Sequence, residues 1–178
     1  MNKTDILKLA LKCRQDDGSV DIIRLVSAVG INVYGHEESD DYNAEIVHIP
    51  AQDKFEILIN TNLSLHQQRF SIAHELAHFV LHPEKIREYG SLKKAADRSD
   101  PRYFPEIEKE ADEFGEELLM PETLLREGFP EIFEAHKKLS FQRIQEIALK
   151  FKVSVLVSAS RLRKFRSDIP YISISYSS

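Results

Sequence analysis

Residues 69–82 read RFSIAHELAHFVLH. This stretch contains the pattern HExxH, in which His74 and His78 stand four residues apart with Glu75 directly after the first of them. On a helix, side chains four residues apart lie on one face, about 5–6 Å from each other. The two imidazoles can therefore share one zinc ion. Glu75 then lies beside the metal, where a general base is needed.

The residues around the pattern are apolar, which predicts that this helix is buried. Phe70, Ile72, Leu76 and Phe79 surround the three polar side chains. Burying two histidines and a glutamate without partners costs free energy, so a metal ion is the simplest explanation for them. HExxH by itself recurs by chance in unrelated proteins, and the apolar neighbours are what strengthen the prediction.

The segments before this helix predict a small α+β core. Apolar periodicity and turn residues predict helices within 4–15 and 19–29 and strands at 31–34, 45–49 and 55–60. Ser64 and Gln67 form a capping box that begins the HExxH helix, and Pro83 ends it. We expect a zincin-like core in which a three-stranded sheet packs on the HExxH helix.

The segments after this helix are mostly helical. We predict an irregular loop at 84–104, helices at 106–120, from 121, at 141–151 and at 154–165, and an edge strand at 169–176. A metallopeptidase-like domain would then occupy residues 1–138. Residues 139–178 would form a helical pair that resembles a helix-turn-helix, followed by a tail.

A catalytic zinc ion usually takes a third protein ligand. His82 continues the four-residue spacing, but it lies about 12 Å along the helix axis from the first histidine and cannot reach the same metal. The helix at 106–120 offers six candidates: Glu106, Glu108, Glu110, Glu113, Glu116 and Glu117. Glu110 flanks the apolar stripe of that helix beside Ala111, where two helices can approach closely, whereas Glu116 is expected to face solvent.

Two blocks of the sequence together resemble the ImmA/IrrE family of metallo-endopeptidases. The first is the HExxH block, and the second is residues 110–121, EADEFGEELLMP. That family pairs HExxH with a later Glu-Ala-(Asn/Asp)-x-Phe-Ala segment that ends in Leu-Leu-Met-Pro. The resemblance implies that Zn2+ is held by His74, His78 and Glu110, with Glu75 as the catalytic acid and base. Gly115 stands where the family commonly has alanine, a packing difference that leaves these ligands unchanged.

The resemblance also implies a substrate class. Members of the family cleave helix-turn-helix transcriptional repressors and so derepress mobile-element, prophage or stress genes. Three other functions stay open on the sequence: a zinc-binding regulator that acts by binding without proteolysis, a component of a toxin–antitoxin pair, and a DNA-binding transcription factor with structural zinc.

The C-terminal helices carry a basic cluster. Arg161, Arg163 and Lys164 end the last predicted helix and could contact phosphates. However, that helix begins with Val155, Leu156 and Val157, which offer no hydrogen bonds to base edges. The net charge of −5 also disfavours DNA as the main partner. We therefore expect these helices to serve packing or repressor recognition rather than DNA binding.

The composition predicts a cytoplasmic protein. No apolar run approaches the roughly 18 residues that a membrane span needs. The first 18 residues lack the uninterrupted apolar core of a signal peptide. Cys13 is the single cysteine, so no internal disulfide can form, which fits a reducing compartment. The oligomeric state does not follow from the sequence.

Overall fold

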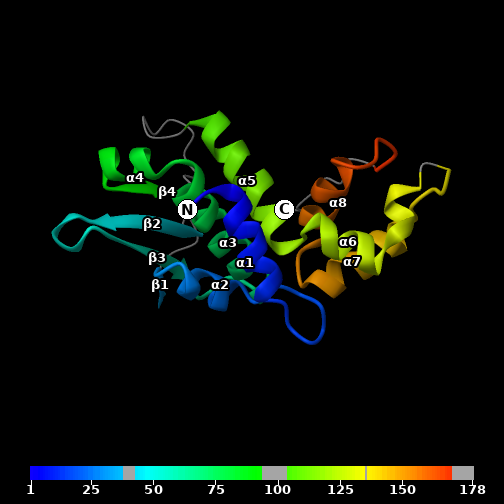
Figure 1. Cartoon of the computed structure of the whole chain (residues 1–178), viewed down its shortest axis with the longest axis horizontal. Helices are drawn as coiled ribbons and strands as arrows, with labels where there is room; N and C mark the ends of the chain where they lie inside the picture. The colour runs from blue at the N-terminus through cyan, green and yellow to red at the C-terminus, as the bar shows by residue number, and fades with distance from the viewer. Residues whose placement is uncertain (38–42, 94–103, 135, 170–178) are drawn as a thin grey trace, which may run out of the picture.

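A computed structural model describes residues 1–37, 43–93, 104–134 and 136–169 (Figure 1). In chain order the elements are α1 (Lys3–Lys12), α2 (Ile22–Ala28), β1 (Asn32–His36), β2 (Ala44–Ile49), η1 (Pro50–Gln52), β3 (Lys54–Asn60), α3 (Leu65–Leu81), α4 (Pro83–Tyr89), β4 (Ser91–Lys93), α5 (Pro105–Leu119), α6 (Glu122–Gly128), η2 (Pro130–Phe133), α7 (Phe141–Phe151) and α8 (Val155–Arg163). The predicted α+β class is confirmed. None of the helices in these ranges is long and apolar enough to cross a membrane.

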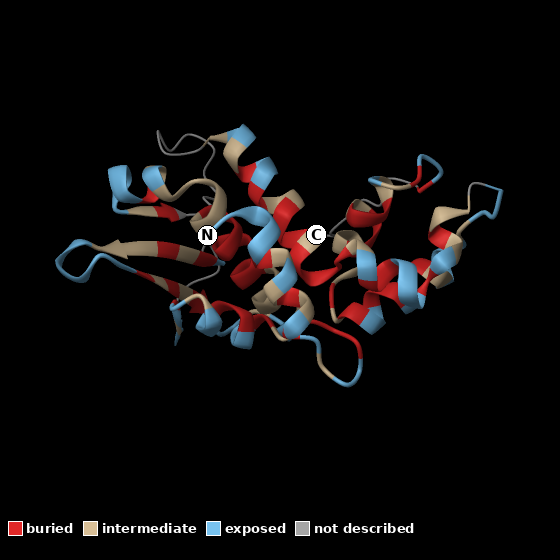
Figure 2. Ribbon diagram, in the orientation of Figure 1, coloured by how far each residue is buried: buried red, intermediate tan, exposed pale blue. Residues whose placement is uncertain are grey.

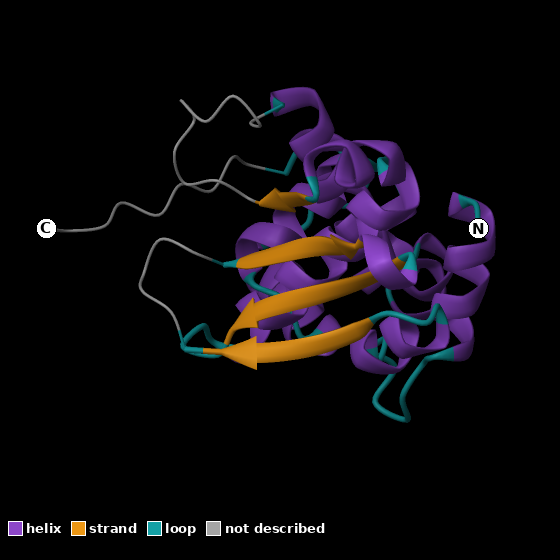
Figure 3. Ribbon diagram, turned by 90° about the vertical axis from the view of Figure 1, so that its left-hand side faces the viewer, coloured by secondary structure: helices purple, strands orange, loops and turns teal. Residues whose placement is uncertain are grey.

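The described strands form one sheet in the order β1-β3-β2-β4 (Figure 3). β1 runs parallel to β3, whereas β2 is antiparallel to both β3 and β4. The strands predicted at 45–49 and 55–60 form an antiparallel pair, with Ile46 opposite Ile57 in the register of β2 and β3. The prediction of three strands was wrong, because β4 adds a fourth strand to the sheet. Both β4 and most of α4 lie in the segment 84–104, which we expected to be irregular. β4 is three residues long, too short to show strand periodicity in the sequence.

α3 lies between the sheet and α5, and this position explains its apolar sequence. It contacts β2 and β3 on one side and α5 on the other. All residues from Ser71 to His78 are buried, and Figure 2 shows buried residues concentrated where these elements meet. The helix is apolar around most of its circumference because protein covers it on more than one face.

The α5 backbone lies close to the α3 backbone at Gly115. A Cβ atom added to Gly115 would lie 3.2 Å from the backbone nitrogen of His74 and 3.4 Å from its Cα. The first distance is shorter than an ordinary van der Waals contact, and the second is at the lower limit of one. The missing side chain therefore allows the α5 backbone to lie directly against the HExxH segment.

The two C-terminal helices form as predicted and pack onto the rest of the chain. Lys152 adopts a left-handed conformation after α7, and the Ser154 side chain caps α8 by accepting from the Val157 amide. α8 packs on α5, and every α8 residue is buried or half-buried. Buried side chains from before and after residue 138 belong to one hydrophobic cluster. The division at residue 138 stays a prediction, and most of the predicted strand at 169–176 lies outside the described residues.

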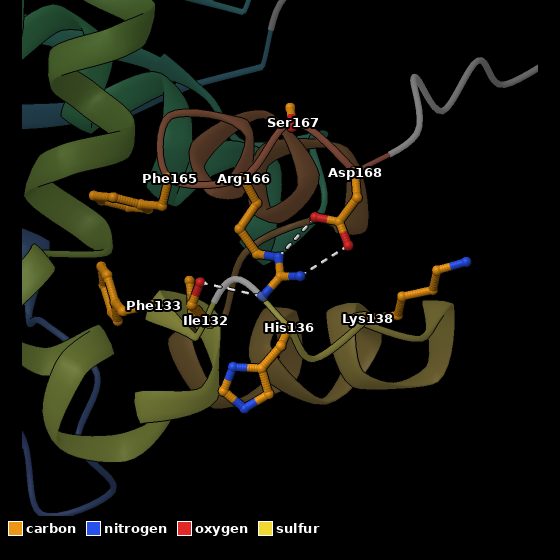
Figure 4. Close-up of a pocket in the computed structure, with 8 residues that line it drawn as sticks. All are labelled: Ile132, Phe133, His136, Lys138, Phe165, Arg166, Ser167 and Asp168. Atoms are coloured by element: carbon orange, nitrogen blue, oxygen red, sulfur yellow. Dashed lines mark hydrogen bonds and ion pairs between the residues drawn. The ribbon is translucent and has the colours of Figure 1, made fainter.

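Arg166, which follows α8, joins η2 and the segment after it to the turn that contains Asp168 (Figure 4). Its guanidinium pairs with the Asp168 carboxylate through Nε at 2.7 Å and Nη2 at 2.8 Å. It also donates to the backbone carbonyls of Glu131, Ile132, Glu134 and Lys137. A groove of about 350 Å³ passes beside it. Because each guanidinium nitrogen already has a partner, we assign Arg166 a structural role.

Replacing Arg166 with methionine should lower the free energy of unfolding by about 2–4 kcal/mol, because four mostly part-buried carbonyls lose a charged donor. Urea denaturation followed by circular dichroism measures this change. Arg24→Met is the matched control, since Arg24 is exposed on α2 and its loss should cost under about 0.5 kcal/mol. Equal midpoints for the two variants would contradict the structural role of Arg166.

Candidate metal centre

Three side chains from two helices meet where α5 contacts α3: His74 and His78 from α3, and Glu108 from α5. The two histidine Nε2 atoms are 3.0 Å apart. Glu108 places Oε2 3.2 Å from the His74 Nε2 atom and Oε1 3.3 Å from the His78 Nε2 atom. A tetrahedral zinc ion with bonds of 2.0–2.1 Å separates its ligand atoms by about 3.3 Å. The three donors therefore have nearly the spacing that such an ion requires.

The protonation states of these side chains also fit a metal ion. Burial lowers the pKa of His78 to about 4, although the hydrogen bond with Glu108 opposes the shift. Burial alone would raise the pKa of Glu108, but hydrogen bonds with His74 and His78 outweigh it and bring the pKa to about 2. At neutral pH this gives a neutral His78 imidazole and an ionised Glu108 carboxylate, the forms in which these groups bind metals.

The third member of this cluster differs from the sequence prediction. We expected Glu110, but the Glu110 side chain is 64% exposed, and its Oε2 atom contacts the His82 Nε2 atom at 3.1 Å. Glu108 occupies the expected place, with a side chain only 11% exposed. Residues next to each other on a helix point about 100° apart. Glu110 thus points away from the face that its neighbour Ala111 turns towards α3.

The spacing of small residues could have identified Glu108 from the sequence. Ala111 and Gly115 are buried on α5, and Gly115 lies against the backbone of His74 in α3. Glu108 precedes these residues by three and seven positions, which places it on the same face of the helix. A glutamate at this spacing from two small residues points into the contact between the helices.

Glu75 lies beside the three donors and points to the sheet. Its side chain is fully buried, and its Oε2 atom accepts a hydrogen bond of 3.1 Å from the backbone amide of Ile46 in β2. The HExxH spacing correctly placed both histidines together and left Glu75 out of the donor cluster. The Ile46 amide is a partner that the sequence could not reveal, because it depends on how α3 packs against the strand.

Each histidine of the cluster has a second partner on its other ring nitrogen. His74 Nδ1 lies 2.9 Å from the Asp112 Oδ1 atom. His78 Nδ1 lies 3.2 Å from the His82 Nδ1 atom. Such partners orient the rings of metal-binding histidines. The Nε2 atoms are thereby left turned towards Glu108.

Glu116 is buried, contrary to the expectation that it faces solvent. It is 5% exposed and lines two adjoining grooves of about 280 and 360 Å³ between α5 and α8. Burial raises the pKa of Glu116 to about 7, repulsion from Asp112 adds to the shift, and a hydrogen bond with Ser160 opposes it. The sequence prediction failed because α8 covers this face of α5.

The basic cluster of α8 turns towards α5. Arg161 is buried, with Nε donating to the Met120 carbonyl at 3.2 Å and Nη2 3.7 Å from the Glu117 Oε1 atom. Lys164 pairs with Glu113. Arg161 therefore serves packing within the chain, and its guanidinium is not presented to a phosphate backbone.

Comparison with known proteins agrees with a metallopeptidase site. Residues 28–163 match the Peptidase M78 family, described as the IrrE N-terminal-like domain. The chain is also 30% identical over 120 residues to the protein named Metallopeptidase ImmA from Bacillus subtilis (strain 168). That match covers 66% of this chain and 66% of the relative, slightly less than two thirds of the relative's length.

Replacing Glu108 or His78 with alanine should abolish stoichiometric zinc binding, because two remaining donors do not complete a protein zinc site. Glu110→Ala should still bind one equivalent of zinc. Metal content after gel filtration in buffer containing zinc, measured by inductively coupled plasma mass spectrometry, distinguishes the two glutamates. Full zinc in Glu108→Ala with none in Glu110→Ala would restore the sequence prediction.

Glu116 should make stability depend on pH. Its folded pKa of about 7 lies above the ordinary value of 4.5, so the folded state holds a proton that the unfolded chain loses between these values. Stability therefore falls as pH rises through this range, by at most about 3 kcal/mol, since one pKa unit corresponds to about 1.4 kcal/mol.

Glutamine mimics the protonated acid, so Glu116→Gln should match the wild type at pH 5 and exceed it at pH 8. Urea denaturation in the presence of a chelator measures both differences. Glu106→Gln, an exposed change on the same helix, is the control. The same difference from wild type at both pH values would rule out this contribution of Glu116.

Proposed function

The chain belongs to the Peptidase M78 family of IrrE N-terminal-like domains, and on this premise we propose that it is a zinc-dependent endopeptidase that cleaves a helix-turn-helix transcriptional repressor. The observation that carries the proposal is the arrangement of His74, His78 and Glu108 around one point, with Glu75 buried beside them. Three protein ligands with a neighbouring carboxylate are typical of catalytic rather than structural zinc sites, which use four protein ligands.

In the proposed reaction, three side chains bind the metal ion and a fourth transfers the proton. His74, His78 and Glu108 would hold the ion. When bound, zinc supplies Lewis-acid chemistry, which acidifies water and polarises a carbonyl group. Glu75 takes the proton from the attacking water and delivers it to the leaving nitrogen. The Ile46 amide holds one oxygen of Glu75 in place, so the carboxylate does not have to be ordered during the reaction.

Burial supports this division of roles. His74, Glu75 and His78 are each at most 1% exposed. A site with little water around it strengthens the electrostatic interactions between the catalytic groups and the substrate. The helix that carries the two histidines contacts both the sheet and α5.

The family resemblance supports a repressor as the substrate, and the charge of the chain is compatible with it. A helix-turn-helix repressor carries basic side chains for phosphate contacts. A chain with a net charge of −5 attracts a basic partner at long range. The inward-facing Arg161 favours a protein partner over DNA for this chain.

Glu75→Gln should reduce cleavage by about 100- to 10,000-fold, the usual contribution of a general base, while zinc binding is retained. The measurement is intact mass spectrometry of the repressor encoded nearest to the gene, incubated with zinc-loaded protein. Glu106→Gln, an exposed change on α5, should cleave like the wild type.

Repressor cleavage, repressor binding and growth on expression together separate two of the alternative functions. A regulator that acts by binding would leave the repressor intact with both wild type and Glu75→Gln, and both would bind it equally. A toxin would arrest growth when expressed alone, and an antitoxin would reverse that arrest. Either result would contradict the proposed endopeptidase.

A further inference from the structure

Resting on the metal role proposed above, we propose that His82 and Glu110 are positioning residues that fix the tautomer and ring orientation of His78. The sequence prediction placed Glu110 on the metal and left His82 without a role. The structure instead connects the two in a chain that ends at the proposed ligand. His78 Nδ1 lies 3.2 Å from His82 Nδ1, and His82 Nε2 lies 3.1 Å from the Glu110 Oε2 atom.

The backbone holds His82 in this place. His82 is the C-cap of α3, with its amide donating to the His78 carbonyl at 2.8 Å, and Pro83 begins α4 directly after it. Its side chain is 9% exposed. The imidazole is thus confined one helical turn beyond His78, where the two rings stand 5.3 Å apart between centroids.

The donor and acceptor in each hydrogen bond of this chain follow from metal binding at His78 Nε2. His78 turns Nε2 towards His74 and Glu108, so binding a metal through that atom leaves the proton of the neutral ring on Nδ1. This proton can be donated only if His82 Nδ1 carries a lone pair. The proton of a neutral His82 is then on Nε2, and Glu110 accepts it. Glu110 thereby selects the His82 tautomer that accepts from His78.

His74 also has a carboxylate partner on its Nδ1 side, but without an intervening histidine. His74 Nδ1 meets a carboxylate directly, at 2.9 Å from the Asp112 Oδ1 atom. Both carboxylates come from α5, like Glu108. α5 would then supply one metal ligand, the carboxylate that orients His74 directly and the carboxylate that orients His78 through His82.

Replacing His82 should reduce metal affinity more than replacing Glu110. His82 is nearly buried and contacts His78 itself, so its loss should weaken metal affinity by about 10- to 100-fold, as is typical for such partners. The carboxylate of Glu110 is 64% exposed, and water screens its charge and can replace it as acceptor. Its loss should therefore have a smaller effect, under about tenfold.

The test is zinc affinity of the purified full chain, measured by competition with a chromophoric chelator. His82→Phe should weaken binding by about 10- to 100-fold. Glu110→Ala should weaken it less, and Glu110→Gln should bind like the wild type because its amide oxygen still accepts. His136→Phe and Glu106→Ala are the matched controls, since the His136 side chain is 80% exposed and Glu106 is an exposed residue of α5.

Two further measurements separate positioning from folding. The unfolding midpoint of the metal-free protein should not change in the Glu110 variants. Adding Glu110→Ala to His82→Phe should cause no further loss of affinity, because Glu110 acts only through His82. Zinc affinities within twofold of wild type in all variants, or additive losses in the double variant, would overturn the positioning roles. A wild type that binds no zinc would instead overturn the metal site itself.

Discussion

The close packing of α5 against α3 is the contact on which the candidate site depends. Gly115 lets the α5 backbone lie against His74, and Glu108 reaches both imidazoles from two turns earlier on the same helix. α3 is fixed from its other side by β2 and β3. The geometry of the site is therefore set by packed helices and a sheet, which hold functional groups more accurately than loops do.

This packing also imposes a cost on the folded state. His74, Glu75, His78 and Glu108 are all buried, and moving such groups out of water is unfavourable unless they gain partners. Asp112 and the Ile46 amide offset part of that cost. An apolar core would be more stable without these closely spaced nitrogen and oxygen atoms. Such a cluster is typical of a site that is retained for function rather than for stability.

The features that could be predicted from the sequence are those that depend on residues close together in the chain. The capping box of Ser64 and Gln67 forms with both of its hydrogen bonds, and the spacing of HExxH brings His74 and His78 together while Glu75 lies beside them. The differences from the sequence predictions depend on contacts between distant segments. The side of α5 that faces α3 puts Glu108, and not Glu110, beside the two histidines. Pairing with β2 makes a strand of residues 91–93, and α8 buries Glu116. The ligand and catalytic roles of these residues remain proposals.

The contact between Arg161 and Met120 has a consequence for how such proteins can be recombined. Arg161 belongs to the last helix, yet it donates to the carbonyl of Met120, which caps the C-terminal end of α5. The helix that carries Glu108 is thus anchored by a residue far away in the chain. A chimaera that joins the first part of this chain to the last helices of a relative would inherit a working site only if the two sides of this contact were exchanged together.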